Sequence, residues 1–258
     1  MAQSNDLNLE LELLEGELQE ENAPDPLDLI DAEGPDQGIS EAQLVEALEN
    51  LSGGYDQTMQ GLKLFCEHRD ARCQPLLVPL LQSSCPILRM SAVYALGRNP
   101  YSAALPLLQQ QFRLDSNSYV RKALAWTLGN YADADVTGDL LQALRFDNAA
   151  VRLWSAGSLV DAALAHPDQL DVVTTELLLT LQVDREAAVR SNCAWGLGRL
   201  HPQLSAEQQL SLEEGLLQAL LHDCDTGVRQ DARSALEQLD DGEVLGRLQT
   251  LVDEGLIG

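Results

Sequence analysis

Three side chains that could bind a soft metal lie close together near the start of the folded part of the sequence. Cys66, His68 and Cys73 fall within eight positions of one another. Thiolates and imidazoles are the ligands that zinc and iron–sulfur clusters favour. The chain has no CxxC pair and no HExxH motif, so this is not the spacing of a common zinc site. The three residues are weak candidates for a metal shared with a partner, and the alternative is packing.

A column of arginines is the next feature that could take part in binding. An apolar residue followed by Arg recurs five times, as Leu88-Arg89, Val120-Arg121, Val151-Arg152, Val189-Arg190 and Val228-Arg229. Such a row of guanidinium groups could bind an acidic ligand. Because an Asp stands a few residues before most of these arginines and the motif recurs in every unit, the pattern favours a structural ladder. In that ladder each Arg pairs with an Asp of its own turn or of the next one.

An aromatic column runs parallel to the arginines. Five residues after each Arg stand Tyr94, Trp126, Gly157, Trp195 and Ser234. By helical projection this position lies off the main apolar stripe. The aromatic residues therefore either face a groove, where exposed Trp is typical of binding hot spots, or wedge between repeats. Trp154 is predicted to point into the core instead.

Two insertions begin with His-Pro at the same point of adjacent repeats. They comprise residues 166–170 and 201–204. Insertions in repeat proteins map to one edge of the array, which is often the functional edge, although a tolerated loop extension explains them equally well. His166 and His201 are therefore candidates for contact with a partner.

The repeats themselves fix the expected fold. After each Arg of the column, the seventh residue is always Leu, the eighth is Gly in three cases, and small residues fill the positions between. The Leu-rich and Ala-rich composition predicts helices, with one helix–turn–helix unit per repeat. We expect an all-α solenoid over residues 39–258, with repeats near 73–98, 101–131, 133–165, 169–200 and 205–238 and a capping helix at 242–254. Ser40 and Gln43 predict a capping box at its start, and Gly129 and Gly198 are expected to cap helices with positive φ.

Charge and composition restrict the partners. The 258-residue chain carries 41 acidic against 16 basic residues, a net charge of -25, and residues 1–38 contain no Lys or Arg. That segment is expected to be a mostly disordered acidic tail. The negative charge disfavours nucleic acid and anionic membranes and favours a basic protein partner. With no visible signal peptide and an odd number of cysteines, we expect a cytoplasmic protein.

Enzyme signatures are absent from the sequence: it has no GxSxG, GxxxxGK[ST] or GxGxxG motif in a suitable context. Binding of another protein is therefore expected rather than catalysis, without a cofactor of the chain's own and without membrane insertion.

The segments 91–97, 120–129, 151–156 and 189–198 resemble HEAT-repeat proteins. More narrowly, they resemble the cyanobacterial HEAT proteins grouped with the phycobilisome lyases, and within that group the IscA-interacting type. That resemblance implies a non-enzymatic partner of an iron–sulfur assembly or carrier protein, with a cluster shared at most through the partner. The alternative within the group is a bilin lyase subunit or a phycobilisome-handling factor that holds an open-chain tetrapyrrole and a phycobiliprotein. The long acidic N-terminus and the two insertions are unlike the lyase subunits.

Overall fold

The computed structural model describes residues 38–131 and 133–257. The chain divides into two units, residues 1–39 and residues 40–258, and the predictions for residues 1–37 lie outside the described residues. Every element in the described part of the second unit is helical. In order these are α2 (Glu41–Asn50), α3 (Tyr55–Glu67), η1 (Ala71–Cys73), α4 (Gln74–Leu77), η2 (Val78–Gln82), α5 (Pro86–Arg98), η3 (Ser102–Ala104), α6 (Leu105–Leu114), α7 (Ser118–Gly129), α8 (Thr137–Phe146), α9 (Ala149–Ala165), η4 (Pro167–Gln169), α10 (Leu170–Val183), α11 (Ala187–Leu200), η5 (His201–Gln203), α12 (Ala206–His222), α13 (Thr226–Gln238) and α14 (Gly242–Asp253).

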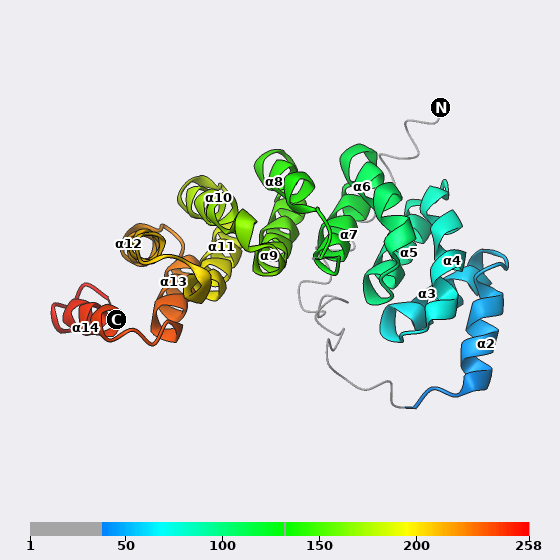
Figure 1. Ribbon diagram of the computed structural model, residues 1–258, viewed down its shortest axis with the longest axis horizontal. Coiled ribbons are helices and arrows are strands. Elements are labelled where there is room, and N and C mark those ends of the chain that lie inside the picture. The colour runs from blue at the N-terminus through cyan, green and yellow to red at the C-terminus, as the bar shows by residue number, and fades with distance from the viewer. Residues whose placement is uncertain (1–37, 132, 258) are drawn as a thin grey trace. The chain divides into compact units, whose positions relative to one another are not determined.

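The helices stack as consecutive antiparallel pairs, which makes the second unit an α-solenoid (Figure 1). The second helices, α3, α5, α7, α9, α11 and α13, each pack closely on the second helix of the next pair. The first helices, such as α6, α8, α10 and α12, touch one another much less. The tightly packed side of the row therefore belongs to the second helices. The predicted all-α solenoid is confirmed.

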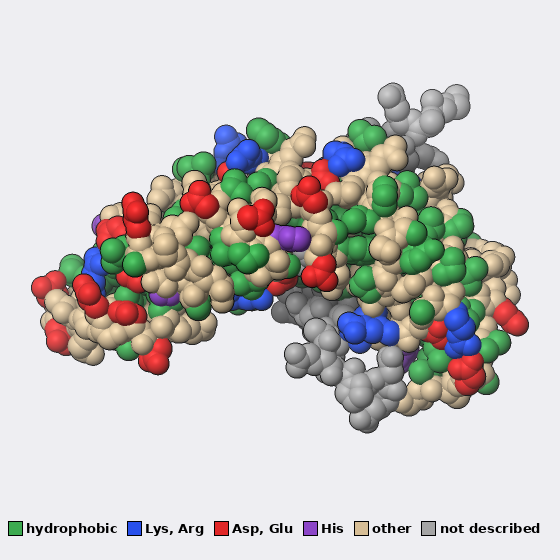
Figure 2. Space-filling view, viewed as in Figure 1, with side chains coloured by type: hydrophobic (Ala, Val, Ile, Leu, Met, Phe, Trp, Pro, Cys, Tyr) green, Lys and Arg blue, Asp and Glu red, His purple; other side chains and the backbone are tan. Residues whose placement is uncertain are grey.

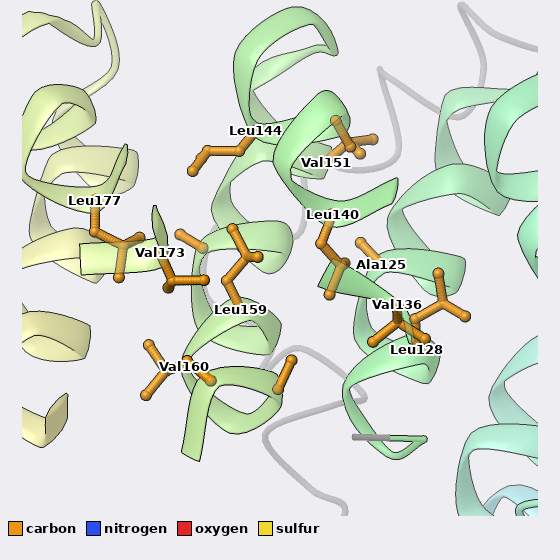
Figure 3. Close-up of a cluster of buried hydrophobic side chains, with 14 of the residues drawn as sticks. Ala125, Leu128, Val136, Leu140, Leu144, Val151, Leu159, Val160, Val173 and Leu177 are labelled. Carbon is orange, nitrogen blue, oxygen red and sulfur yellow. The ribbon is translucent and has the colours of Figure 1, made fainter. Parts of the chain in front are cut away.

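One continuous apolar core runs through the row. In its centre, Leu128 of α7, Leu140 of α8 and Leu159 of α9 are buried together with Val173 and Leu177 of α10, so neighbouring pairs share one core (Figure 3). Each pair covers an apolar face that its neighbour would otherwise expose to water, and this is the reason that such units are stable only as an array. The predicted capping box is also present, because Ser40 Oγ accepts the Gln43 backbone N–H at 3.3 Å.

The glycines of the repeat do not act as helix caps. Gly198 lies inside α11 and Gly129 is the last residue of α7, whereas positive φ occurs among the described glycines only at Gly38 and Gly255. A Cβ added to Gly129 would lie 2.6 Å from the Ser158 hydroxyl oxygen. The prediction of positive-φ caps was wrong because close approach of adjacent second helices, rather than chain reversal, excludes a side chain at these positions.

Four of the five arginines of the column form the predicted ladder, whereas Arg229 donates to the Asp223 backbone carbonyl and to the Thr226 hydroxyl. Arg89 pairs with Asp115, Arg121 with Asp147, Arg152 with Asp184, and Arg190 with Asp223. In every pair the Nε and Nη2 groups donate to the two carboxylate oxygens of the next repeat at 2.7–2.8 Å. The Nη1 group of each of these arginines donates to a backbone carbonyl in its own turn. One side chain therefore fixes the register of two consecutive repeats.

The surface is unevenly charged. On the face seen in Figure 2, acidic side chains are dense over α12, α13 and α14 and sparse over α4, α5 and α6. None of the helices in the described ranges is long and apolar enough to cross a membrane.

Candidate functional site

The three tryptophans of the chain converge on one hollow in the face formed by the second helices. This tryptophan hollow has a volume of about 240 Å³. Its lining comes from α7, α9 and α11 and from the residue after α7: Trp126, Gly129, Asn130, Trp154, Gly157, Ser158, Asp161, Asn192 and Trp195. Residues up to seventy positions apart in the sequence meet here because three successive second helices lie side by side.

The hollow exists because the aromatic column is interrupted. Trp126 of α7 and Trp195 of α11 occupy that column, and α9 between them has Gly157 at the same position. A Cβ at Gly157 would make an ordinary van der Waals contact, 3.4 Å, with the Asn192 amide nitrogen. A large side chain at this position would fill the space, so the glycine keeps the gap between the two tryptophans open.

Trp126 is wedged between repeats. Its ring meets Tyr94 edge-on, with centroids 5.6 Å apart at 63°. A Cβ on Gly97 would lie 2.3 Å from the same ring. Trp126 therefore packs α7 against α5 with one part of its indole, and with another part it lines the hollow. Tyr94 thus packs against Trp126 between repeats, and Trp126 both packs there and lines the hollow.

Trp195 is the exposed member of the column. It is 46% exposed, although large apolar side chains are usually buried. The Arg199 guanidinium lies 4.8 Å from the centre of its ring, which is cation–π distance. Arg199 also pairs with Asp161 of α9 at 3.0 Å. Trp195 is thus held at the surface by a neighbour rather than covered by the core.

Trp154 differs from its prediction. It packs against the core, as its sequence position suggested, but it is only partly buried and also lines the hollow. The remaining polar lining is held in place: the Asn192 amide donates to the Leu153 carbonyl at 2.6 Å, and the Ser158 hydroxyl donates to the Ala125 carbonyl at 2.8 Å. Both bonds cross between neighbouring second helices, so they join the helices that form the walls.

The two histidine insertions form short 3₁₀ turns, η4 and η5, outside the hollow. His201 is buried, and its Nε2 lies 3.0 Å from Glu213 Oε1 of α12. That burial argues against direct partner contact by His201. His166 is partly buried, and its Nε2 has no partner within the structure. The two residues therefore do not form a common surface with the tryptophans.

The cysteine and histidine candidates do not form a ligand cluster. The Cys66 thiol donates to the Ser91 carbonyl at 3.6 Å, and Cys73 is buried. Burial raises the pKa of each thiol to about 12, so both stay protonated near neutral pH. The described residues contain no group of three or more His, Cys, Asp or Glu side chains placed to hold a metal ion.

A second hollow, of about 230 Å³, lies at the other edge, between α6 and α8. Three of its charged residues, Asp115, Arg121 and Asp147, belong to the arginine ladder. One of its lining residues, Phe146, belongs to a set of exposed apolar residues at the ends of first helices that sequence reasoning did not select: Leu114, Phe146 and Val183, at 72%, 80% and 65% exposure. Each directly precedes a ladder aspartate, which is the sequence signal that identifies them.

Sequence reasoning also missed Asp161, Asn192 and Arg199 of the site. Asp161 and Arg199 occupy the position one helical turn after the aromatic column, where the other repeats have Arg98, Asn130 and Gln238. Aligning this second column would have found Asp161 and Arg199, whereas Asn192 lies outside it.

Comparisons with known proteins agree with this architecture. A family model described as HEAT repeats matches residues 56–129 and 109–180. None of the curated proteins matches the chain.

Several solved structures share the fold at low sequence identity. An engineered protein is 20% identical, with a TM-score of 0.55 over 79% of this chain and 100% of that one. A designed armadillo repeat protein in complex with the peptide (KR)4 is 17% identical, with a TM-score of 0.52 over 78% of this chain and 100% of that one. The Escherichia coli protein YibA is 20% identical, with a TM-score of 0.53 over 83% and 76%. The described part of this chain is therefore an α-solenoid of stacked helix pairs, and residues 56–180 are similar to HEAT repeats.

Proposed function

We propose that the protein is a non-enzymatic scaffold that binds a partner protein along its second helices, with the tryptophan hollow as the anchor site. The observation that carries this proposal is the convergence of all three tryptophans on one surface hollow. Tryptophan is among the residues most enriched in binding hot spots, and a half-exposed one such as Trp195 gains most when a partner covers it.

The size of the hollow supports a side chain as its occupant. Pockets for drug-sized ligands measure roughly 300–1,000 Å³ and enclose most of the ligand. The tryptophan hollow, at about 240 Å³, is smaller and open on one side. It suits one anchoring side chain of an extended segment. The peptide complex of the designed armadillo repeat protein illustrates that such a row of helices can hold a peptide.

The partner that the sequence resemblance suggests is an iron–sulfur carrier of the IscA type. If the carrier brings a cluster, its own ligands must hold that cluster, because Cys66 is partly buried, Cys73 is buried, and burial raises the pKa of both thiols. Cys224 is the exposed thiol among the described cysteines, and it lies apart from any group of metal-binding side chains.

A bilin lyase subunit is the alternative that the same resemblance allows. A long open-chain tetrapyrrole would find aromatic surface in the tryptophan hollow, but only part of the molecule would be enclosed at that volume. Protein binding therefore has the stronger support.

The test is a calorimetric titration with a purified IscA-type carrier. It is carried out on the unmodified protein and on the variants Trp195→Ala and Phe146→Ala. Phe146 is the matched control because it is an exposed aromatic residue outside the tryptophan hollow. We expect Trp195→Ala to weaken binding by at least tenfold and Phe146→Ala to leave it unchanged.

The outcomes separate the claims. No binding by the unmodified protein would eliminate the IscA-type partner. Equal binding by unmodified protein and Trp195→Ala would eliminate the hollow as the anchor. Addition of phycocyanobilin tests the alternative, because binding would shift the visible absorption of the bilin.

A further inference from the structure

The lining of the tryptophan hollow carries one charged residue, Asp161. Its other polar lining residues are the neutral Asn130, Ser158 and Asn192. Tryptophan rings attract cations through the negative potential of their faces, and a nearby carboxylate adds to that attraction. The chain as a whole has a net charge of -25, which draws cationic groups toward it over longer distances.

Arg199 shows how a cation binds at this place. Its guanidinium lies over the Trp195 ring at 4.8 Å and contacts the Asp161 carboxylate at 3.0 Å. The Arg199 side chain is 38% exposed and that of Asp161 is 46% exposed, so neither is enclosed by the protein. An incoming guanidinium or ammonium group could therefore take over the same two contacts.

We propose that the tryptophan hollow receives a cationic side chain, Arg or Lys, from an extended segment of the partner, and that this side chain displaces Arg199 from Trp195 and Asp161. This inference rests on the proposed function and names the chemistry of the partner. An apolar anchor is less suitable, because it would remove Asp161, Asn130 and the outer edge of Asn192 from water without replacing their hydrogen bonds. Arg combines a flat face for the indole rings with donors for the carboxylate.

The experiment uses the peptide acetyl-(Gly-Arg)4-amide as its probe, with the peptides in which citrulline or norleucine replaces Arg as comparisons. Citrulline keeps the shape of Arg and removes its charge. Because all three tryptophans line the hollow, their fluorescence reports binding there, and calorimetry gives the affinity. We expect the Arg peptide to bind at least tenfold more tightly than either neutral peptide.

The first pair of variants tests the carboxylate. Asp161→Asn removes one negative charge in the hollow, and Asp253→Asn removes one in α14, outside it. We expect Asp161→Asn to weaken the Arg peptide about three- to tenfold and Asp253→Asn to change its affinity less than twofold. Equal effects of the two variants would mean that only net charge matters, and the inference would be overturned.

The second pair tests the displacement. Arg199→Met and Arg247→Met each remove an exposed arginine that pairs with an acid of another helix, Asp161 and Glu214 respectively. We expect Arg199→Met to tighten the Arg peptide about three- to tenfold, beyond the effect of Arg247→Met, because Trp195 and Asp161 become free. No difference between these variants would contradict the displacement.

The failure of this inference can be told from the failure of the proposed function. If the partner protein needs Trp195 while the Arg and norleucine peptides bind equally, the anchor site stands and its cationic occupant is wrong. If the partner ignores Trp195 while the Arg peptide still depends on Asp161 and Trp195, the hollow binds cations but is not the anchor for that partner.

Discussion

Arg190 and Asp223 form a two-pronged ion pair across consecutive repeats, with Nε and Nη2 each 2.7 Å from a carboxylate oxygen. Arg190 Nη1 also donates to the Asp184 carbonyl at 2.8 Å, and Asp223 Oδ1 accepts the Asp225 backbone N–H at 2.9 Å. The pair therefore connects the turn of one repeat to the turn of the next. Both side chains are at least nine-tenths buried, so water replaces few of these bonds.

The first prediction concerns the strength of this connection. A double-mutant cycle with Arg190→Met and Asp223→Asn should give a coupling energy of about 2 kcal/mol, because a nearly buried bidentate pair is lost. Each single variant leaves a buried polar group without its partner and should lower the free energy of unfolding by about 2–4 kcal/mol. Urea denaturation followed by circular dichroism measures both quantities.

The exposed pair Arg233–Glu237, at i and i+4 in α13, serves as the control. The same cycle there should give no more than about 0.5 kcal/mol. Similar coupling energies for the two pairs would show that the ladder adds no special stability.

The second prediction concerns pH. The Arg190 guanidinium lowers the pKa of Asp223. Burial by itself would raise the pKa of Asp184, but the hydrogen bonds from Arg152 and the Glu186 backbone, together with the positive charges of Arg152 and Arg190, outweigh burial, so the net shift is downward. A carboxyl whose folded pKa is lowered stabilises the fold above its unfolded pKa of about 3.9, and this contribution is lost as pH falls through the folded pKa. The urea midpoint of the unmodified protein should therefore fall steeply below about pH 4.

Asp223→Asn removes one of these carboxyls, so its urea midpoint should fall less steeply over the same range. At low pH the repulsion among the many carboxylates weakens in both proteins, so the difference between their slopes does not depend on it. Identical slopes for the two proteins would contradict a lowered pKa at Asp223.

The third prediction concerns the packing of the second helices. Gly97→Ala places a methyl group 2.3 Å from the Trp126 ring and should lower the free energy of unfolding by about 1–3 kcal/mol. Gly246→Ala in α14 meets no atom within 4 Å and should raise it by about 0.5–1 kcal/mol, because alanine favours a helix interior. Thermal denaturation of both variants measures the difference, and equal shifts would argue against close helix approach at Gly97.

The fourth prediction separates the two roles of tryptophan. Trp126→Ala should cost about 2–4 kcal/mol of stability, since the indole packs against Tyr94 and fills the space at Gly97. Trp195→Ala should cost less than about 1 kcal/mol, because its side chain is 46% exposed. Chemical denaturation decides the point; a larger loss for Trp195→Ala would place that residue in the core.

The fifth prediction concerns thiol reactivity. Cys224 is exposed, whereas Cys193 is buried and burial raises its pKa. Near pH 8, a disulfide reagent such as dithiobisnitrobenzoate should label Cys224 within minutes and Cys193 only after unfolding, because the thiolate is the reactive form. Mass spectrometry identifies the labelled residue, and early labelling of Cys193 would show that the core opens at that point.

The sequence predicted the fold well because its determinants are periodic. An Arg near the start of α5, α7, α9, α11 and α13 and a Leu seven residues later repeat in register. Four of these arginines make the same contact, with the Asp in the turn of the next repeat. The role of the repeated glycine was predicted incorrectly because the contact that decides it comes from another helix. Gly129 stands at a helix end, where a cap is usual, but the atom that excludes its side chain belongs to Ser158 on another helix.

The candidate site was predicted only in part because it depends on a break in the periodicity. The column containing Trp126 and Trp195 is visible in the sequence, and so is the missing aromatic residue at Gly157. The meeting of Trp154 and Asp161 with that column depends on the rotation of α9 against its neighbours, which no local pattern reports. The burial of His201 was missed because its partner Glu213 lies twelve residues later, on α12, and no local pattern shows that contact.

The most direct test of the central claim is a side-by-side capture of partners by the tagged full-length protein and by its Trp195→Ala and Phe146→Ala variants, quantified by mass spectrometry. The lysate should come from the cells that encode the chain. If the tryptophan hollow anchors the partner, the proteins retained by the unmodified chain are lost with Trp195→Ala and kept with Phe146→Ala. Retention of these proteins by Trp195→Ala would contradict an anchor in the tryptophan hollow. Loss with Phe146→Ala alone would place the binding surface at the edge of the first helices instead.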